Sequence, residues 1–416
     1  MTNTATAAST GSADQAGRLG PAYWRLWSAT VVSRLGDALR VPALALLAAT
    51  VTRDPRLVAT VVVAGHLAPL LLGVIGGVYA DRWDPRRTMA TVDALRAALV
   101  AAFAVVVATG HAGIMSLAAC AFTLAALGIF FDASAFAVLP SLVPAERLPT
   151  ANGRLQAGAA VAGGFVGAPA AGMLFAVATA LPFAIDAVSF AIAATVALTL
   201  RPAPDRTGSA PAPARRSVCR EAGDGLRWIW RDRMLRLITA LTAVTNMAIS
   251  GLIAVLVLFA LDTLAVPQAS YGLFMSTAVL GALAGALTAG RLARRLGTLR
   301  TLGWVLAIET LALATLALSR HPLPGALALA AFSAGTVTWN ALWAAYGQQR
   351  VPAGLLGRVG SSQRMVGLIT APIGAAAAGM VAHAAGVGSV VVAAAILFAL
   401  VTAVAWPVLR RGAPTG

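Results

Sequence analysis

The chain has 416 residues, of which 59% are apolar and only 11% are charged. These proportions lie far outside those of soluble globular proteins and indicate that lipid is the solvent for most of the chain. The formal net charge is +16, and all 31 basic residues are arginines. Almost all of them fall on one side of the predicted membrane spans, so no nucleic-acid partner is expected.

Residues 1–21 are polar and rich in Ala, Thr, Ser and Gly. They lack the basic start and compact apolar run of a cleavable signal peptide, so we expect a disordered cytoplasmic tail. Apolar runs follow, each close to the ~20 residues that a helix needs to cross a hydrocarbon core of about 30 Å. The twelve predicted spans lie at about 22–50, 57–80, 88–109, 114–137, 157–178, 181–200, 234–262, 271–290, 299–318, 324–346, 362–384 and 388–409.

Residues 201–233 form the one long polar interruption between the apolar runs. Their first part is rich in Pro and Ala, which is typical of a linker. Six spans precede the linker, at 22–200, and six follow it, at 234–410, with a short tail at 411–416. The predicted fold is therefore an all-α membrane protein with twelve transmembrane helices in two pseudo-symmetric six-helix bundles.

Short motifs recur in the same order in the two halves. The fourth and tenth runs are each followed by a Val-Pro-Ala triplet. Gly164 and Pro169 in the fifth run match Gly367 and Pro372 in the eleventh. Internal repeats of this kind are typical of transporters, and they indicate a duplication of six spans.

The arginines are distributed unevenly between alternate loops. In the twelve-span arrangement only Arg53, Arg56 and Arg320 fall on one side, and the arginines of the other loops fall on the opposite side. By the positive-inside rule, both termini and the linker are expected in the cytoplasm of a multi-pass protein of the cell membrane.

The loop at 77–87 lies between the second and third runs and carries a cluster of charge. It resembles the signature that the major facilitator superfamily has between its helices two and three, and the resemblance extends over about residues 22–410. The superfamily implies a transporter. The residues that match the signature and form the expected gate motif are Gly77, Asp81, Arg82, Arg86 and Arg87, together with Ala80.

Two departures from this signature are visible: Tyr79 stands for Leu, and Asp84-Pro85 stands for Gly-Arg. In the superfamily the aspartate of the motif contacts the start of the eleventh helix when the cytoplasmic side is closed. The resemblance therefore implies a gate at Asp81, where a carboxylate near a helix N-terminus is electrostatically favoured. The alternative is a charged loop that only sets topology.

A closer likeness is to twelve-span bacterial exporters of the enterobactin-exporter and macrolide-efflux kind. It is carried by motifs that begin at Ser33, Leu139, Ala151, Ile185 and Gly357. The likeness implies export of a small amphipathic molecule, such as a drug, siderophore or secondary metabolite, by alternating access. Proton antiport is the expected coupling, with the proton gradient as energy source and no cofactor.

The fifth run contains a motif of small residues that resembles the glycine-proline motif of these exporters. Small residues let helices approach closely, and a proline weakens the local hydrogen-bond ladder so that the helix can bend. A merely tight helix pair is the alternative. The motif consists of Gly163, Gly164, Gly167, Pro169 and Gly172.

The first run carries Arg34, Asp37 and Arg40. Each charge within a membrane costs roughly 2.5–3.5 kcal/mol on insertion scales, so such groups usually face a cavity or a partner. At about 100° per residue Asp37 lies between the two arginines on one side of the helix. Either Asp37 binds a proton or a cationic substrate, with an arginine holding it ionised, or the three residues form a permanent structural ion pair.

Asp93 and Arg96 repeat this spacing in the third run, and Glu309 in the ninth run is equivalent to Arg96 in position. We consider all three as coupling candidates, against a structural ion pair with the loop arginines or with a neighbouring helix. Asp132 and Asp186 lie nearer the ends of their runs. For these two, contact with solvent or with a helix end is the expected role.

Asn246 in the seventh run and Trp339 and Asn340 in the tenth are candidates for lining a substrate cavity. An aromatic belt at the membrane interface is the alternative for the aromatic side chains of the tenth run.

Two other transport functions remain open, namely uptake of a solute and flipping of a lysophospholipid. The alternative from another class is a membrane-embedded transferase. The sequence has no Asp-rich metal motif, no spaced His pair and no nucleophile with a plausible base. We therefore expect no enzyme and no metal site, but a monomer whose partners are the lipid bilayer and a small-molecule substrate.

Overall fold

The computed structural model describes residues 19–80, 83–200, 227–351 and 356–411. Within these ranges the regular elements are helices, and no strand forms. Most of the linker and two residues of the 77–87 loop, Asp81 and Arg82, lie outside the described residues.

The N-terminal half consists of five single long helices and one composite rod that is interrupted by a π-helical segment. The single helices are α2 (Pro21–Val51), α3 (Pro55–Ala80), α4 (Pro85–Ala108), α5 (Ile114–Leu142) and α8 (Leu181–Leu198), and the composite rod joins α6 (Leu148–Ala160), η2 (Val161–Gly167) and α7 (Ala168–Val177).

The C-terminal half repeats this plan. Its six rods are α10 (Arg233–Leu258) with the π-helical η3 (Phe259–Thr263), α11 (Tyr271–Leu296), α12 (Thr298–Leu318), α13 (Pro322–Arg350), α14 (Leu356–Ala385) and α15 (Val387–Arg411).

Twelve long rods agree with the twelve predicted spans, and the predicted fold class is confirmed. Eleven of the rods are long and apolar enough to cross a membrane. The exception is α2, whose apolar character is interrupted by Arg34, Asp37 and Arg40.

Proline and aspartate mark where α4 begins. The Asp84 side chain accepts a hydrogen bond of 3.0 Å from the backbone N–H of Arg86 and so caps the helix, and Pro85 occupies its first turn. Proline is favoured there because its missing N–H would have had no helical partner. This capping explains why Asp84-Pro85 stands in the loop at 77–87 in place of the expected Gly-Arg.

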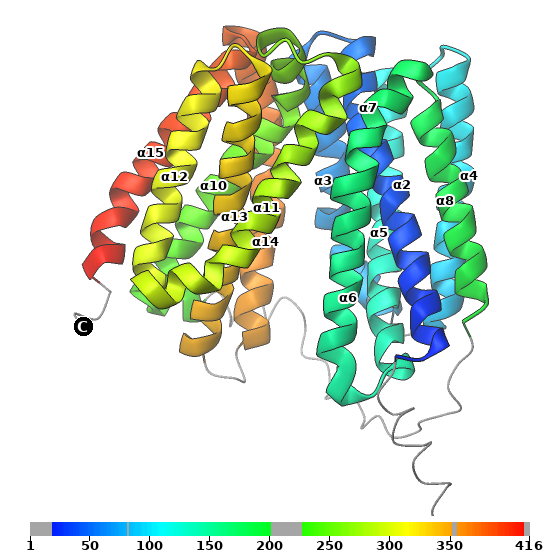
Figure 1. Ribbon diagram of the computed structural model, residues 1–416, viewed down its shortest axis with the longest axis horizontal. Coiled ribbons are helices and arrows are strands. Elements are labelled where there is room, and N and C mark those ends of the chain that lie inside the picture. The colour runs from blue at the N-terminus through cyan, green and yellow to red at the C-terminus, as the bar shows by residue number, and fades with distance from the viewer. Residues whose placement is uncertain (1–18, 81–82, 201–226, 352–355, 412–416) are drawn as a thin grey trace, which may run out of the picture.

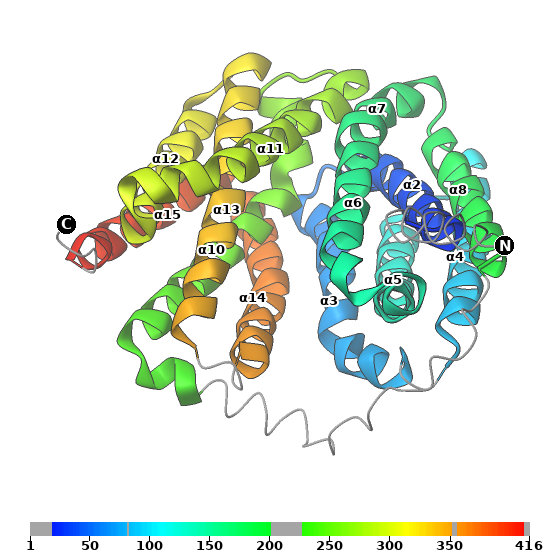
Figure 2. The ribbon, with the colours of Figure 1, turned by 60° about the horizontal axis from the view of Figure 1, so that its bottom comes forward.

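The two halves lie side by side, as Figures 1 and 2 show. The start of α2 and the end of α15 lie at the same end of the molecule, which we call the termini face. The halves are in contact at the opposite face and diverge toward the termini face (Figure 1).

One ion pair and one histidine–carboxylate contact join the halves at the face opposite the termini. Arg53 Nη1 lies 2.8 Å from Asp262 Oδ1, and His383 Nδ1 lies 3.4 Å from Asp54 Oδ1. Between them α14 packs directly on α3, where a Cβ at Gly379 would lie 2.8 Å from the Cβ of Ala59. We call the four charged or titratable residues Arg53, Asp54, Asp262 and His383 the inter-half closure.

We predict that reversing one charge of the inter-half closure separates the halves. Arg53→Glu should place two carboxylates together and lengthen the distance between spin labels at His111 and Leu323, which are exposed on this face in opposite halves. The double variant with Asp262→Arg should restore the original distance. Electron–electron double resonance in detergent measures both.

The matched control is Arg320→Glu, because Arg320 lies on the same face but donates only to carbonyl oxygens of its own half. An equal lengthening in this control would show that net charge, and not the pair, holds the halves together.

The second contact of the closure should depend on pH. Hydrogen bonds from Arg56 lower the pKa of Asp54 from 3.8 to about 2, so Asp54 stays ionised at every working pH. The contact should therefore keep the negative charge of Asp54 as the pH falls below 3.8 and lose it only near pH 2. Acidification through this range should shift the label distances toward the long, open population, and Asp54→Asn should abolish the shift because an amide does not titrate there.

Candidate functional site

A cavity of about 920 Å³ lies between the two halves. This volume is typical of sites for small molecules. The charged residues that line it all belong to the N-terminal half, on α2, α4 and α5. The described lining residues of the C-terminal half carry no charge and are mostly aliphatic, for example Ile253, Val257, Met275 and Leu368.

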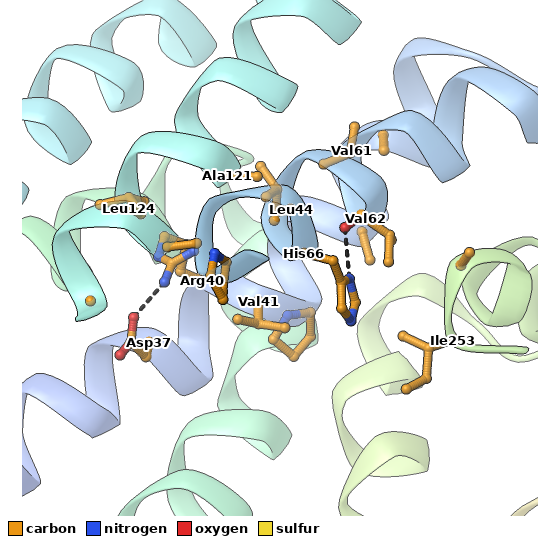
Figure 3. Close-up of a pocket in the computed structure, with 18 of the residues that line it drawn as sticks. Asp37, Arg40, Val41, Leu44, Val61, Val62, His66, Ala121, Leu124 and Ile253 are labelled. Carbon is orange, nitrogen blue, oxygen red and sulfur yellow. Dashed lines mark hydrogen bonds and ion pairs between the residues drawn. The ribbon is translucent and has the colours of Figure 1, made fainter. Parts of the chain in front are cut away.

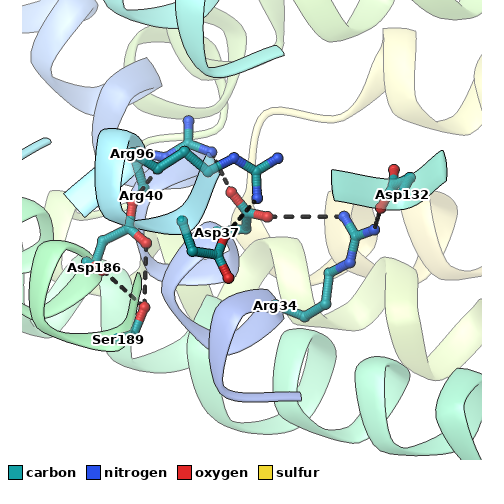
Figure 4. Close-up of polar contacts among 8 residues, drawn as sticks. Arg34, Asp37, Arg40, Arg96, Asp132, Asp186 and Ser189 are labelled. Carbon is teal, nitrogen blue, oxygen red and sulfur yellow. Dashed lines mark hydrogen bonds and ion pairs between the residues drawn. The ribbon is translucent and has the colours of Figure 1, made fainter. Parts of the chain in front are cut away.

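The charges of the cavity wall form a continuous chain of ion pairs (Figure 4). Arg34 binds Asp132 on α5 and lies 3.8 Å from Asp37, and Asp37 also accepts from Arg40. Arg40 Nε in turn donates to Asp186 Oδ2 on α8 at 2.9 Å. We call these five residues the ion-pair chain. It runs from the half-exposed side chain of Asp132 to Asp186, which is fully buried.

The ion-pair chain differs from the expectation for Asp132 and Asp186, which the sequence assigned to solvent or helix-end contacts. Their arginine partners lie 98 and 146 residues away in the chain. No local pattern reveals such pairs, whereas Asp37 and Arg40 are three residues apart on one helix.

Gly36 allows Asp186 to reach Arg40. A Cβ at Gly36 would collide with Ser189 Oγ and Asp186 Oδ1 of α8. Ser189 Oγ donates to the Asp186 backbone carbonyl at 2.8 Å, which holds this pair of residues against α2. The glycine of the first helix and the Asp-x-x-Ser motif of α8 are therefore two parts of one helix contact.

Arg96 forms a second, separate charge pair beside the cavity. Its Nη1 lies 3.2 Å from Asp93 Oδ1 on the same helix. The structural alternative expected from the sequence placed the partner among the loop arginines or on a neighbouring helix instead. The guanidinium lies over the rings of Phe131 and Phe190, at 5.1 Å and 5.2 Å from their centroids. Aromatic faces attract a cation, so they stabilise Arg96 where water is excluded.

His66 on α3 also lines the cavity, and Figure 3 shows its ring in the space that faces Ile253. Its Nδ1 lies 2.9 Å from the carbonyl oxygen of Val62. A carbonyl can only accept, so Nδ1 carries the proton and Nε2 is the free ring nitrogen. Sequence analysis missed this residue, because a single histidine in an apolar run gives no signal.

The glycine motif lies between the halves. Gly167 packs against Leu35 and Ala38 of α2, and a Cβ at Gly163 would be 3.7 Å from Ala38. On the other side, a Cβ at Gly172 would be 2.6 Å from the carbonyl oxygen of Ala269 in the C-terminal half.

The same motif contains the π-helical segment η2, which ends two residues before Pro169. Proline cannot donate to the carbonyl four residues earlier, so the ladder changes register at this point. Gly164 lies within η2, and a Cβ there would collide with Val279 of α11. This rod is therefore widened where the two halves touch.

Asn246, Trp339 and Asn340 do not line the large cavity. They surround a second cavity of about 20 Å³ inside the C-terminal half, together with Glu309 and Thr336. The three predicted cavity residues thus lie around Glu309, one of the predicted coupling residues, and not beside the ion-pair chain.

The described part of the loop at 77–87 carries little that bears on a gate. Arg86 donates through Nη1 to the carbonyl oxygen of Leu200, and Arg87 lies 3.8 Å from Asp84. Gly77 lies in α3, but its surroundings are not described, and Asp81 and Arg82 lie outside the described residues. The gate at Asp81 stays a prediction.

Comparison with known proteins agrees with this architecture. A family model described as Major Facilitator Superfamily matches residues 26–375. The chain belongs to this superfamily. It is thus a multi-pass membrane protein of a transporter family.

Two curated relatives are uncharacterised MFS-type transporters of Mycobacterium bovis and Mycobacterium tuberculosis. Each is 34% identical over 153 residues, which is 36% of this chain and 34% of the relative. The match thus spans about a third of the length of these relatives. The finer likeness to enterobactin and macrolide exporters stays a prediction.

Solved structures show the same fold. A bacterial homologue of the iron transporter ferroportin, in an inward-facing state, has a TM-score of 0.73 at 16% identity, covering 93% of this chain and 98% of its own. The nucleoside transporter NupG scores 0.71 at 14% identity, with 93% and 99% covered. A bacterial homologue of the human lysosomal transporter Spinster scores 0.72 at 13% identity, with 94% and 96% covered. At such identities the likeness concerns the fold alone.

We predict that Gly36→Ala destabilises the protein by about 1–3 kcal/mol, because the added methyl group overpacks the contact with Ser189 and Asp186. Thermal unfolding in detergent measures the effect. The control is Gly153→Ala, a helix position where a Cβ meets nothing within 4 Å, and this variant should be neutral or slightly more stable. Equal stability of the two variants would contradict the close α2–α8 contact.

Proposed function

We propose that this protein is a secondary active transporter that exports small amphipathic cations in exchange for protons by alternating access. The observation that carries the proposal is the large cavity, whose charged wall belongs to one half and whose aliphatic wall belongs to the other. An amphipathic molecule satisfies both walls at once, with its polar group on α2 and α5 and its apolar part against α10 and α11.

The charge of the ion-pair chain supports a cation. Three carboxylates share two guanidiniums, so one negative charge is unbalanced when all five groups are ionised. Asp93 and Arg96 balance each other and leave this count unchanged. Either a proton or a cationic substrate can supply the missing positive charge. The proton and the cationic substrate would then compete for one negative charge, and such competition is the condition that antiport requires.

Alternating access requires that the halves rock about the cavity between them. Under the positive-inside rule the termini face is cytoplasmic, so the inter-half closure would lie on the outer side of the cell membrane. The present arrangement would then receive substrate from the cytoplasm, which is the starting point of export. The resemblance to bacterial exporters supports the same direction.

The charge preference can be tested with two molecules of nearly the same shape and opposite charge, tetraphenylphosphonium and tetraphenylborate. We predict that the purified protein binds the cation at least ~tenfold more tightly, which corresponds to about 1.4 kcal/mol. Isothermal titration calorimetry in detergent measures both. Tighter binding of the anion would overturn the proposed substrate class.

The coupling is tested at Asp37, the centre of the ion-pair chain. Asp37→Asn balances the remaining charges, so we expect it to retain binding through the apolar wall but to lose the preference for the cation. Transport of tetraphenylphosphonium into inverted vesicles should no longer be accelerated by a pH gradient. Glu309→Gln makes the same exchange outside the large cavity and should have a smaller effect. If the gradient still drives Asp37→Asn but not Glu309→Gln, the coupling site lies in the C-terminal half.

A further inference from the structure

Glu309 is an acidic residue without a charged partner inside the C-terminal half. It lies on α12 with 3% of its surface exposed, and no basic residue in the described ranges forms an ion pair with it. The residues of α10, α13 and α15 that line its cavity carry no other titratable side chain. An ionised carboxylate in such a place is costly unless a proton or a cation neutralises it.

The hydroxyl of Thr336 is placed to accommodate both protonation states of Glu309. Thr336 Oγ1 lies 2.9 Å from Glu309 Oε1 and 3.2 Å from the carbonyl oxygen of Phe332. Since a hydroxyl has one hydrogen, it donates to Glu309 when the carboxylate is ionised. When the carboxyl group is protonated, it can donate to Thr336 Oγ1, and the hydroxyl then donates to Phe332. The hydrogen bond between Thr336 and Glu309 is therefore kept in both protonation states.

The cavity beside Glu309 suits a single water molecule. Its volume of about 20 Å³ exceeds the ~10–15 Å³ that one water requires. Two buried polar atoms of its wall, Thr242 Oγ1 and Trp339 Nε1, have no hydrogen-bond partner. An indole N–H can only donate, so it needs an acceptor, which a water oxygen supplies. Asn340 also lines the cavity and is exposed, so it marks where the cavity comes close to the protein surface.

We infer that Glu309 is a proton-binding site in the C-terminal half, served by one water molecule held between Thr242 and Trp339. A hydronium ion arriving past Asn340 gives its proton to the carboxylate. One O–H bond forms on Glu309 and one breaks on the hydronium, which leaves neutral water in the cavity. The Trp339 N–H argues for water and not an alkali cation in the cavity, because the partial positive charge of a hydrogen-bond donor repels a cation.

This site is separate from the ion-pair chain, which the proposed function uses for coupling. The inference does not depend on transport, since it concerns the protonation of one side chain. A neutral Glu309 also agrees with the smaller effect expected of Glu309→Gln, because glutamine resembles the protonated acid.

Infrared difference spectroscopy of the detergent-purified protein tests the site directly. A pH titration of the wild type should show a carboxyl C=O band that is absent in Glu309→Gln and retained in Asp37→Asn. Thr336→Val should move the midpoint of this band to higher pH by about one unit, since the ionised form loses the stronger hydrogen bond. Thr310→Val is the matched control and should leave the midpoint unchanged, because Thr310 bonds to Leu306 and Thr402 instead.

Three results would overturn the inference. The first is a carboxyl band that persists in Glu309→Gln, and the second is a midpoint that is the same in Thr336→Val as in the wild type. The third is a midpoint that shifts when sodium chloride replaces choline chloride at constant ionic strength. The last result would identify an alkali-cation site in place of a proton site. Failure of tetraphenylphosphonium transport, by contrast, would leave the infrared result intact.

Discussion

Charge that is removed from water must be balanced by charge, and this constraint organises the N-terminal half. Three charged residues on α2 lie in a segment that otherwise reads as a membrane span. Each finds its counter-charge on another helix or one turn away. Removing one partner of a buried pair usually costs about 3–5 kcal/mol, so the contact between Arg40 and Asp186 fixes how α2 sits against α8. The more exposed contact between Arg34 and Asp132 adds less to the packing of α2 on α5. The cavity wall is a consequence of that packing.

The two halves accommodate buried acidic side chains in different ways. The N-terminal half pairs its acids with arginines and leaves one end of the ion-pair chain, at Asp132, open to the cavity. The C-terminal half has one buried acid, Glu309, which is surrounded by hydroxyl, amide and indole groups. A duplicated fold therefore carries two unlike polar centres, one that joins helices by charge and one that relies on hydrogen bonds. Alternating access needs only the backbone symmetry, so the side chains of the halves are free to diverge.

Small residues decide where the halves touch. Gly172 and Gly379 let backbones of opposite halves approach to contact distance at the face opposite the termini. Within the same rod as Gly172, the π-helical turn before Pro169 replaces a regular hydrogen-bond ladder. Hydrogen bonds of irregular register are weaker than those of an α-helix, so this is the place where the rod bends at least cost. The inter-half closure adds charge to an interface that is otherwise built from small apolar side chains.

The sequence by itself determined the number of spans, their grouping into two halves and the pairing of near neighbours such as Asp37 with Arg40. These features depend on local composition and on the helical repeat, which a sequence displays directly. Tertiary structure alone decided that Asp132 and Asp186 complete the ion-pair chain, that His66 faces the cavity and that Asn246, Trp339 and Asn340 surround Glu309. The rotation of each helix about its axis sets these contacts. In lipid an apolar residue gains little by facing inward, so the sequence pattern of a span carries almost no signal of that rotation.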